Sequence, residues 1–229
     1  MAAQNHLIEI LAGEDRRRLV AVCETVELAL GQVVGEPATP TRHVYFPVDS
    51  FISLVATVPG SPGIEVGMVG REGMLGSQLA LGVGTTPLHS VVQGAGTALR
   101  ARSAAFRREL ASSATLRRAI DRYIAVVMVQ LATSAVCLRF HEIGPRLARW
   151  VLMSRDRAGA DTFAMTHQYL AYMLGVRRAG ITAAAMRLQR LGLIEYRRGT
   201  LNVLDRRGLE AAACPCYAAD LRAYSDRLK

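Results

Sequence analysis

The sequence is poor in cysteine, in lysine and in long apolar segments. Its four cysteines are unevenly spaced, which favours a reducing compartment over a disulfide framework. Charged side chains interrupt residues 1–19, so this segment lacks the continuous apolar core of a signal peptide. The longest apolar run, residues 123–138, contains polar side chains and is too short to span a bilayer comfortably. We therefore expect a cytoplasmic protein with no membrane partner.

Motifs that carry catalysis are also missing. The glycines between Gly70 and Gly76 are not followed by the Lys and Ser or Thr of a phosphate-binding loop, and no serine lies in a nucleophile elbow. A metal-dependent β-barrel enzyme needs clustered His and Glu ligands, which the N-terminal half does not offer. The sequence therefore predicts a protein that is not an enzyme.

One pair of cysteines has a spacing that suits a metal. Cys214 and Cys216 could chelate a soft metal or form a strained disulfide. Two thiolates are only half of a zinc site, however, and we find no histidine near them. We assign the pair a structural role and expect no metal and no cofactor.

Positive charge is concentrated in the last two fifths of the chain. Residues 139–229 contain sixteen Lys and Arg against eight Asp and Glu, a net charge of +8, whereas residues 1–138 contain twelve against eleven, a net charge of +1. Lys229 is the only lysine, so a single arginine indicates less here than in a chain of mixed cations. The asymmetry between the halves still favours double-stranded DNA as a partner, because basic domains release the counterions condensed on its phosphates.

Residues 166–193 have the pattern of a DNA-binding helix-turn-helix. Ala171 is small enough for two helices to cross closely, and Gly175 suits the left-handed cap that ends the first helix. Ile181, Ala185 and Leu188 then recur at the spacing of a buried helical stripe. The same pattern also occurs in ordinary helical hairpins.

A basic hairpin follows the two predicted helices and favours the DNA-binding interpretation. Two short β-prone runs, 193–196 and 201–204, flank a turn that contains Arg197, Arg198 and Gly199. Helix, turn, helix and wing in this order predict a winged helix-turn-helix. The DNA-binding residues that we predict are Thr166, His167, Arg177, Arg178, Gly180, Thr182, Arg197 and Arg198.

The first hundred residues predict an antiparallel β-sandwich or barrel. Short β-prone runs alternate there with Gly and Pro, and helices are expected before and after them at about 14–26 and 103–110. The predicted strands are 28–34, 44–46, 51–57, 64–69, 89–93 and 97–101.

A long helix is predicted from 114 to about 140, because no Gly or Pro interrupts this segment. Since it is apolar on more than one side, one face can pack on the β-domain and another, with Ile124, Met128 and Ala135, on a symmetry mate. The alternative is a fully internal helix of a monomer. Gly144-Pro145 then predicts a break before a new helix at 146–154.

This order of elements resembles the Crp/Fnr family of bacterial transcription regulators. The most specific motifs are Tyr45-Phe46-Pro47, Val69-Gly70-Arg71-Glu72-Gly73-Met74 and the segment 166–194. The resemblance implies an α+β fold with a β-roll sensory domain at 1–113, a dimerisation helix at 114–140 and a winged helix-turn-helix at 141–229. It further implies a homodimer that reads a palindromic DNA site and has RNA polymerase as a partner.

The resemblance carries over to the DNA-contacting residues only in part. Arg178 matches the family's base-reading arginine, whose guanidinium can bind O6 and N7 of guanine. Ala179 stands where a glutamate is typical, and Ala183 replaces a second arginine. We therefore expect a different DNA target, read by Arg177, Arg178 and Thr182, with Thr166, His167, Arg197 and Arg198 on phosphates.

The effector is not identified by the resemblance. The loop at 85–89 has no arginine to pair with a cyclic-nucleotide phosphate, and a buried anion without a positive partner is costly. The N-terminal cysteine cluster of the iron–sulfur members is absent, since only Cys23 lies there. Arg71 and Glu72 are the candidate effector residues, for an effector that is unidentified or whose binding has been lost. The alternative is a cyclic-nucleotide-responsive regulator with an atypical pocket.

Overall fold

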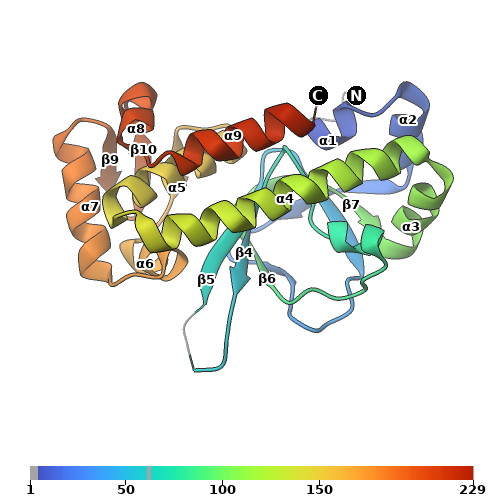
Figure 1. Ribbon diagram of the computed structural model, residues 1–229, viewed down its shortest axis with the longest axis horizontal. Helices are drawn as coiled ribbons and strands as arrows, with labels where there is room; N and C mark the ends of the chain where they lie inside the picture. Colours follow the sequence, from blue (N-terminus) through green and yellow to red (C-terminus); the bar gives the residue numbers. More distant parts are fainter. Residues whose placement is uncertain (1–4, 61–62, 229) are drawn as a thin grey trace.

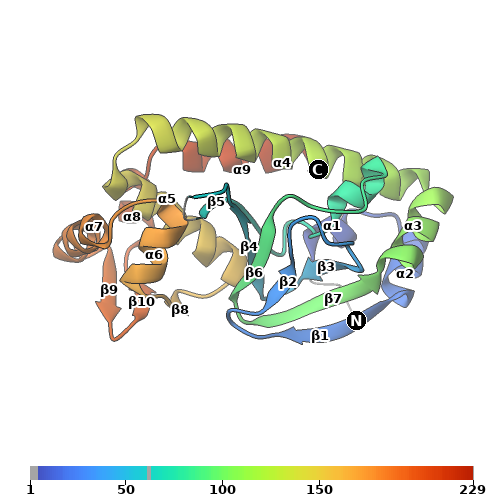
Figure 2. The ribbon, with the colours of Figure 1, turned by 90° about the horizontal axis from the view of Figure 1, so that it is seen from below.

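The computed structural model describes residues 5–60 and 63–228 of the chain. A long helix, α4 (Ala114–Phe140), runs along most of the length of the molecule. The β-roll packs under one half of α4, and a winged helix-turn-helix lies beyond its C-terminal end (Figures 1 and 2). The predicted α+β fold is confirmed, with antiparallel sheets in the N-terminal part and a helix-turn-helix in the C-terminal part.

The β-roll consists of two antiparallel sheets. One has the strand order β1-β7-β3, and the other has the order β2-β6-β4-β5. Strand β4 is almost continuously buried, because one face lies in the roll and the other faces the C-terminal domain. The strands are β1 (Cys23–Leu28), β2 (Val33–Gly35), β3 (His43–Pro47), β4 (Phe51–Ala56), β5 (Ile64–Val69), β6 (His89–Gly94) and β7 (Gly96–Arg102).

Near the N-terminus the structure corrects two predictions. The helix expected at 14–26 ends at Ala21, and Cys23–Leu28 forms β1, because its residues pair with β7 along its whole length. The strand expected at 28–34 is broken by a turn in which Gly31 has a φ of 78°. The short helices of this region are α1 (His6–Glu9), α2 (Gly13–Ala21), η1 (Ser77–Leu81) and α3 (Ser103–Ser112), the last close to its predicted place.

Helix α4 begins at its predicted position because the Ser113 hydroxyl accepts a hydrogen bond from Leu116 N at 2.9 Å. One face is buried against the roll and the C-terminal helix, and it includes the polar side chains of Gln130 and Ser134. Among the described residues α4 is the one helix that could cross a membrane by length and composition.

The opposite face of α4 is apolar and exposed. Met128 is 65% exposed and Leu131 is 37% exposed. Steps of four and three residues connect the positions on this face, which is the spacing of a coiled-coil seam. We call this set the outer seam. It consists of the half-buried Ile124 and the exposed Met128, Leu131, Ala135 and Leu138.

The C-terminal part begins with α5 (Ile143–Ala158). Gly144 and Pro145 lie inside its first turn, where proline is tolerated because the backbone N–H there has no helical partner. The break predicted before the helix is therefore wrong in its position. The remaining elements are β8 (Thr162–Ala164), α6 (His167–Leu174), α7 (Arg178–Arg190), β9 (Ile194–Arg197), β10 (Thr200–Val203), α8 (Arg206–Ala212) and α9 (Cys216–Arg227).

Helix α9 leaves the winged helix-turn-helix and runs back along α4 (Figures 1 and 2). Gln130 Nε2 donates to the hydroxyl of Tyr224 at 2.8 Å, and Arg149 Nη2 lies 2.6 Å from Asp220 Oδ2 in a buried ion pair. Helix α9 therefore connects α4 and α5 instead of extending the winged helix-turn-helix.

Candidate nucleic-acid interface

The residues from which the helix-turn-helix was predicted form the caps and the turn of its two helices. Thr166 caps α6 by accepting a hydrogen bond from Tyr169 N at 3.1 Å. Gly175 ends α6 with a φ of 62°, a left-handed conformation that glycine adopts without strain. Val176 N then donates to Ala171 O at 2.9 Å, which closes the turn.

Helix α7 buries one stripe and exposes the other. Ile181, Ala185 and Leu188 are buried as predicted, together with Ala184. The opposite side, which would face a DNA groove, carries Ala179, Thr182, Ala183, Met186 and Arg190. Most of this face is made of small side chains, so the backbone of α7 can approach a groove closely.

The wing is a hairpin with two arginines at its tip. Strands β9 and β10 pair antiparallel, with Arg197 opposite Thr200, and β8 adds a third strand. Arg198 and Gly199 form the turn with φ values of 49° and 80°, as in the two-residue hairpin turns with two left-handed residues. This turn leaves both arginines exposed, and Arg197 Nε lies 3.2 Å from Glu195 Oε1.

Arg177 and Arg178 lie together at the start of α7. Arg177 is the residue before the first turn, Arg178 is the first helical residue, and both side chains are exposed. Within residues 5–60 and 63–228 neither arginine forms an ion pair. Their charges therefore remain free for an anionic partner.

His167 and Thr182, both predicted to contact DNA, also contact each other. His167 Nδ1 lies 3.1 Å from Thr182 Oγ1, which in turn donates to Arg178 O at 3.1 Å. The imidazole stacks on Tyr196 of β9 with ring centroids 4.3 Å apart. Burial and then the charge of Arg178 lower the pKa of His167. This small network fixes the start of α6, the start of α7 and the wing relative to one another.

Gly180 lies on the side of α7 that meets α5. A Cβ atom at this position would stand 2.7 Å from Ile143 Cδ1, so the glycine allows the two helices to approach. Sequence reasoning missed three exposed side chains farther along α7, which are Met186, Arg187 and Arg190. Met186 and Arg190 continue the helical spacing of Ala179 and Ala183, so the sequence pattern could have identified these two.

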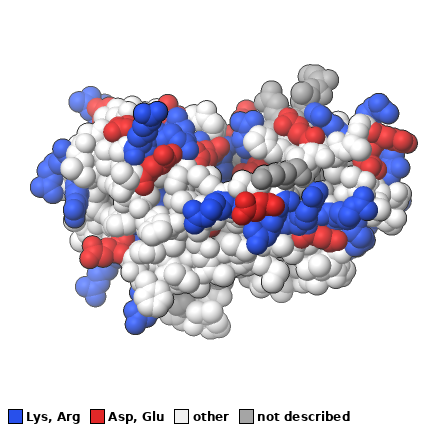
Figure 3. Space-filling view, turned by 45° about the horizontal axis from the view of Figure 1, so that its top comes forward, with Lys and Arg blue, Asp and Glu red and all other residues white. Residues whose placement is uncertain are grey.

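Part of the positive charge of the C-terminal region is internal. Arg149 pairs with Asp220, Arg157 Nε lies 2.9 Å from Glu72 Oε1, and Arg146 donates to the backbone oxygen of Leu174. The arginines of α7 and Arg198 at the tip of the wing are exposed and form no ion pair within the described residues. Figure 3 shows Lys and Arg side chains projecting at the end of the molecule formed by this domain.

The roll touches the helix-turn-helix directly through β5. Glu65 accepts hydrogen bonds from the indole Nε1 of Trp150 on α5, at 2.9 Å, and from the hydroxyl of Ser53. Ile64 packs against Gly175 at the end of α6. Because Glu65 lies in this contact, burial raises the pKa of its carboxyl to about 7.

We predict that Glu65 makes the stability of this contact depend on pH. A carboxyl whose pKa is raised in the folded state favours folding fully below its ordinary value near 4.5 and loses that contribution as pH rises through about 7. The melting temperature of the protein should therefore fall between pH 5 and pH 8, by the equivalent of roughly 2 kcal/mol. Glu65→Gln should flatten this dependence, as measured by thermal unfolding across the pH range. Glu27→Gln, at an exposed carboxyl, is the control; parallel curves for wild type and Glu65→Gln would contradict the prediction.

The candidate effector residues Arg71 and Glu72 lie between domains. Glu72 pairs with Arg157 of α5, and its Oε1 accepts from Gly70 N at 3.1 Å and from the Tyr224 hydroxyl of α9 at 3.3 Å. Arg71 lines a cavity of about 290 Å³ between the roll, α5 and α9. Glu72 thus connects three parts of the fold, and its carboxylate is already occupied by protein partners.

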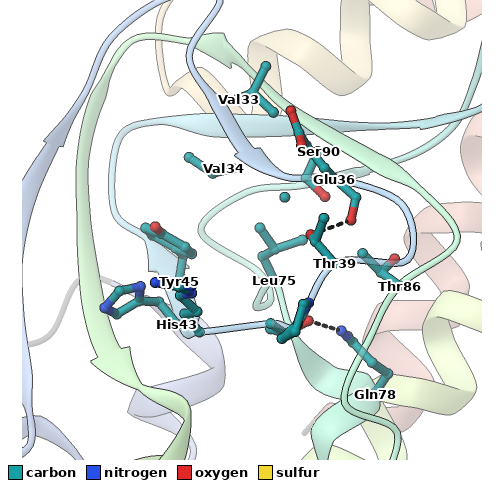
Figure 4. A pocket seen from close by; sticks show the side chains of 15 residues that line it. Val33, Val34, Glu36, Thr39, His43, Tyr45, Leu75, Gln78, Thr86 and Ser90 are labelled. Carbon is teal, nitrogen blue, oxygen red and sulfur yellow. Dashed lines mark hydrogen bonds between the residues drawn. The ribbon is translucent and has the colours of Figure 1, made fainter.

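A larger cavity of about 480 Å³ opens in the β-roll (Figure 4). Its lining includes Thr86 of the loop at 85–89, Gln78, which donates to Thr41 Oγ1 at 3.0 Å, and the exposed Arg42. The fully buried hydroxyl of Ser90 lines it too and has no hydrogen-bond partner among the residues that the structure describes. The sequence therefore missed one cation, Arg42, that the fold brings to this pocket.

The cysteine pair near the C-terminus has neighbours that the sequence did not reveal. Cys137, at the end of α4, lies 3.5 Å from Cys214, measured between the sulfur atoms. Cys216 Sγ lies 3.5 Å from Nδ1 of His141. Our interpretation that no histidine lies near the pair was wrong, because the fold brings together segments more than seventy residues apart.

Similar proteins are known for the helix-turn-helix and for the fold of the whole chain. Residues 145–212 match the family model of the Crp-like helix-turn-helix domain. The fold is similar to FixK2 from Bradyrhizobium japonicum, with a TM-score of 0.70 and 13% identity over 84% of this chain and 98% of that one. A comparison with curated protein sequences gives no match.

Two further solved structures have the same fold. A CRP-family transcriptional regulator from Thermus thermophilus gives a TM-score of 0.66 and 17% identity over 82% of this chain and 96% of that one. The c-di-GMP-responsive global regulator CLP from Xanthomonas campestris gives 0.61 and 14% identity over 85% and 100%. Residues 145–212 are thus similar to a Crp-like helix-turn-helix domain, and the chain as a whole has the fold of these regulators.

Proposed function

We propose that the protein is a homodimer that binds a palindromic DNA site with one recognition helix, α7, per half-site. The observation that carries this proposal is the exposed, unpaired pair Arg177 and Arg178 at the start of α7. An arginine in this place can donate two hydrogen bonds to a guanine in the major groove. The wing arginines lie on the same domain and can bind the phosphates beside that groove.

The outer seam of α4 supports the homodimer. Four of its five apolar residues are exposed in the single chain and Ile124 is half-buried. Two copies of the helix would cover each other's seams around a two-fold axis. Such a dimer presents two recognition helices and requires half-sites about 34–36 Å apart. In this arrangement residues 1–113 form the sensory domain, 114–140 the dimerisation helix and 141–229 the DNA-binding part.

The face of α7 supports a DNA target of its own. Thr182 is half-buried, and its hydroxyl is already bonded to Arg178 O and His167 Nδ1. Ala179, Ala183 and Met186 offer apolar contacts, which suit the methyl groups of thymine. We propose that Arg178 and Arg177 select guanine and that the apolar part of α7 favours thymine. Thr166, Arg197 and Arg198 then hold phosphates, while His167 and Gly180 position the helix.

The second candidate function is a regulator that responds to a cyclic nucleotide. The roll cavity favours it, because Arg42 and the unpartnered hydroxyl of Ser90 line a space large enough for a small ligand. Calorimetric titrations of the protein with cyclic AMP and with cyclic di-GMP measure whether either nucleotide binds. They distinguish this function from that of an effector-free regulator. RNA polymerase is the proposed partner on the promoter, and the cytoplasm is the proposed compartment.

Selection of DNA from a random pool tests the proposed function. The purified protein, without added ligand, is mixed with random duplexes, and the bound fraction is sequenced. We expect an enriched palindrome with guanines at equivalent positions of both halves. Salt-sensitive binding without any enriched sequence would contradict effector-independent readout. Enrichment of a single, unrepeated half-site would contradict the homodimer.

A further inference from the structure

Four metal-binding side chains meet where three helices join. Cys137 comes from the last turn of α4, His141 from the residue that follows α4, Cys214 from the link between α8 and α9, and Cys216 from the first residue of α9. Each residue offers one sulfur or nitrogen atom as a ligand, and these four atoms all lie within 4.8 Å of one another. The three cysteines are free and buried. No part of the DNA-binding function described above uses these side chains.

Two of the separations between the donor atoms are close to those around a single tetrahedral ion. Zinc–sulfur bonds of about 2.3 Å and zinc–nitrogen bonds of about 2.0–2.1 Å place two sulfur ligands ~3.8 Å apart and a sulfur and a nitrogen ~3.5 Å apart. The observed separations are 3.5 Å between the sulfurs of Cys137 and Cys214 and 3.5 Å between Cys216 Sγ and His141 Nδ1. A cluster of several irons would hold its thiolates farther apart.

The charges around the four side chains suit three thiolates and one divalent cation. Such a centre has a net charge of −1, and a buried charge needs a partner. Arg146 and Arg149 both lie close enough to interact electrostatically with Cys137 and Cys214. Arg149 is already neutralised by Asp220, whereas Arg146 makes no ion pair within the described residues. Arg146 therefore supplies the single positive charge that the centre requires.

We propose that Cys137, His141, Cys214 and Cys216 bind one zinc ion. Four protein ligands complete the tetrahedron and leave no open position, which is the arrangement of a structural zinc site. Thiolate sulfur and imidazole nitrogen also select zinc over magnesium or calcium, which prefer oxygen ligands.

The position of this site gives the ion a mechanical role. Cys137 and His141 belong to the junction between α4 and α5, and Cys214 N donates to Pro145 O in the first turn of α5 at 3.3 Å. A bound zinc would therefore fix the end of the proposed dimerisation helix, the start of the DNA-binding part and the start of α9 to one another. Because α5 packs on α7, the ion would also restrict the orientation of the recognition helix.

Metal content of the full-length protein tests the site without any DNA. After expression in zinc-containing medium and gel filtration under reducing conditions, wild type should contain one zinc per chain. Cys214→Ser and Cys137→Ser should lower the zinc content at least roughly tenfold, because each removes a ligand. Cys23→Ser is the matched control, since Cys23 lies in the roll outside the cluster, and it should retain the metal. Zinc content that stays unchanged in Cys214→Ser would overturn the proposal.

Cobalt substitution gives a second readout that does not depend on how the variants fold. Wild type loaded with Co²⁺ should show thiolate-to-metal absorption bands and the intense visible bands of tetrahedral cobalt. The absence of these bands in reduced wild-type protein would overturn the proposal. A disulfide is the competing use of the same sulfurs: a metal-free protein that has lost two of its four thiols would also overturn it. DNA binding plays no part in these measurements, so their outcome is separate from that of the random-pool selection.

Discussion

A glutamate in place of Met128 should leave the protein as a 24.8 kDa monomer where the wild type has twice that mass. Met128 is in the middle of the outer seam and 65% exposed in the single chain. A two-fold axis along the seam brings both copies of residue 128 to the same layer, so two carboxylates would face each other there. Burying an unpaired carboxylate costs at least about 3 kcal/mol, which weakens the dimer by roughly 100-fold or more.

The loss of the dimer should also be visible in DNA binding. A monomer binds one half-site and forgoes the effective concentration of the second, so affinity for the palindrome should fall by roughly 100-fold or more. Sedimentation equilibrium gives the mass, and a fluorescence-anisotropy titration gives the affinity.

Arg122→Ala serves as the control for Met128→Glu. It makes the same change in net charge on an exposed position of α4 outside the outer seam, and it should stay dimeric. A Met128→Glu protein that sediments like wild type would exclude the outer seam as the dimer interface.

Arg178→Ala should remove both affinity and base preference at the guanine that Arg178 reads. A bidentate arginine–guanine contact contributes about 1–3 kcal/mol of discrimination. Two half-sites therefore correspond to a loss of at least roughly 30-fold in specific affinity. Binding to DNA of unrelated sequence should change much less, because phosphate contacts dominate it. Titrations of the selected palindrome and of a scrambled duplex measure the two effects.

Two variants distinguish base contact from general charge. Arg198→Ala removes a wing arginine and should weaken binding to both duplexes to a similar extent, with a smaller dependence on salt. Arg222→Ala removes an exposed cation on α9, away from α7, and should change neither. If Arg178→Ala behaved like Arg198→Ala, Arg178 would be a phosphate contact and the base-reading role would be wrong.

The helix-turn-helix was predictable because its signals are local. Thr166, Gly175 and the stripe from Ile181 to Leu188 act within one turn or one helix, and each does in the structure what its residue type favours. The strand β1 was missed for the opposite reason. Its sequence is compatible with a helix, and pairing with β7, which lies far away in the sequence, decides its conformation.

The contacts that join the domains could not be predicted from the sequence. Glu72 was recognised as a candidate site residue, but nothing near it in the chain indicates Arg157 or Tyr224. Likewise, Cys137 and His141 have the i, i+4 spacing of a possible ligand pair. This pair can be recognised as part of a metal site only when the position of Cys214 and Cys216 beside it is known. Packing between distant segments brings these side chains together, and the residue pattern within one segment does not predict such contacts.

The apolar cluster that the roll shares with the DNA-binding part limits how the protein can change shape. Phe51 and Met68 of the roll belong to the same buried cluster as Trp150 and Leu170. Moving the winged helix-turn-helix away from the roll would expose both surfaces to water, at a cost of about 25 cal/mol for each Å² of apolar area. Exposed apolar surface also raises the heat capacity. A ligand that released the helix would therefore bind with a positive change in heat capacity, opposite in sign to that of simple ligand burial.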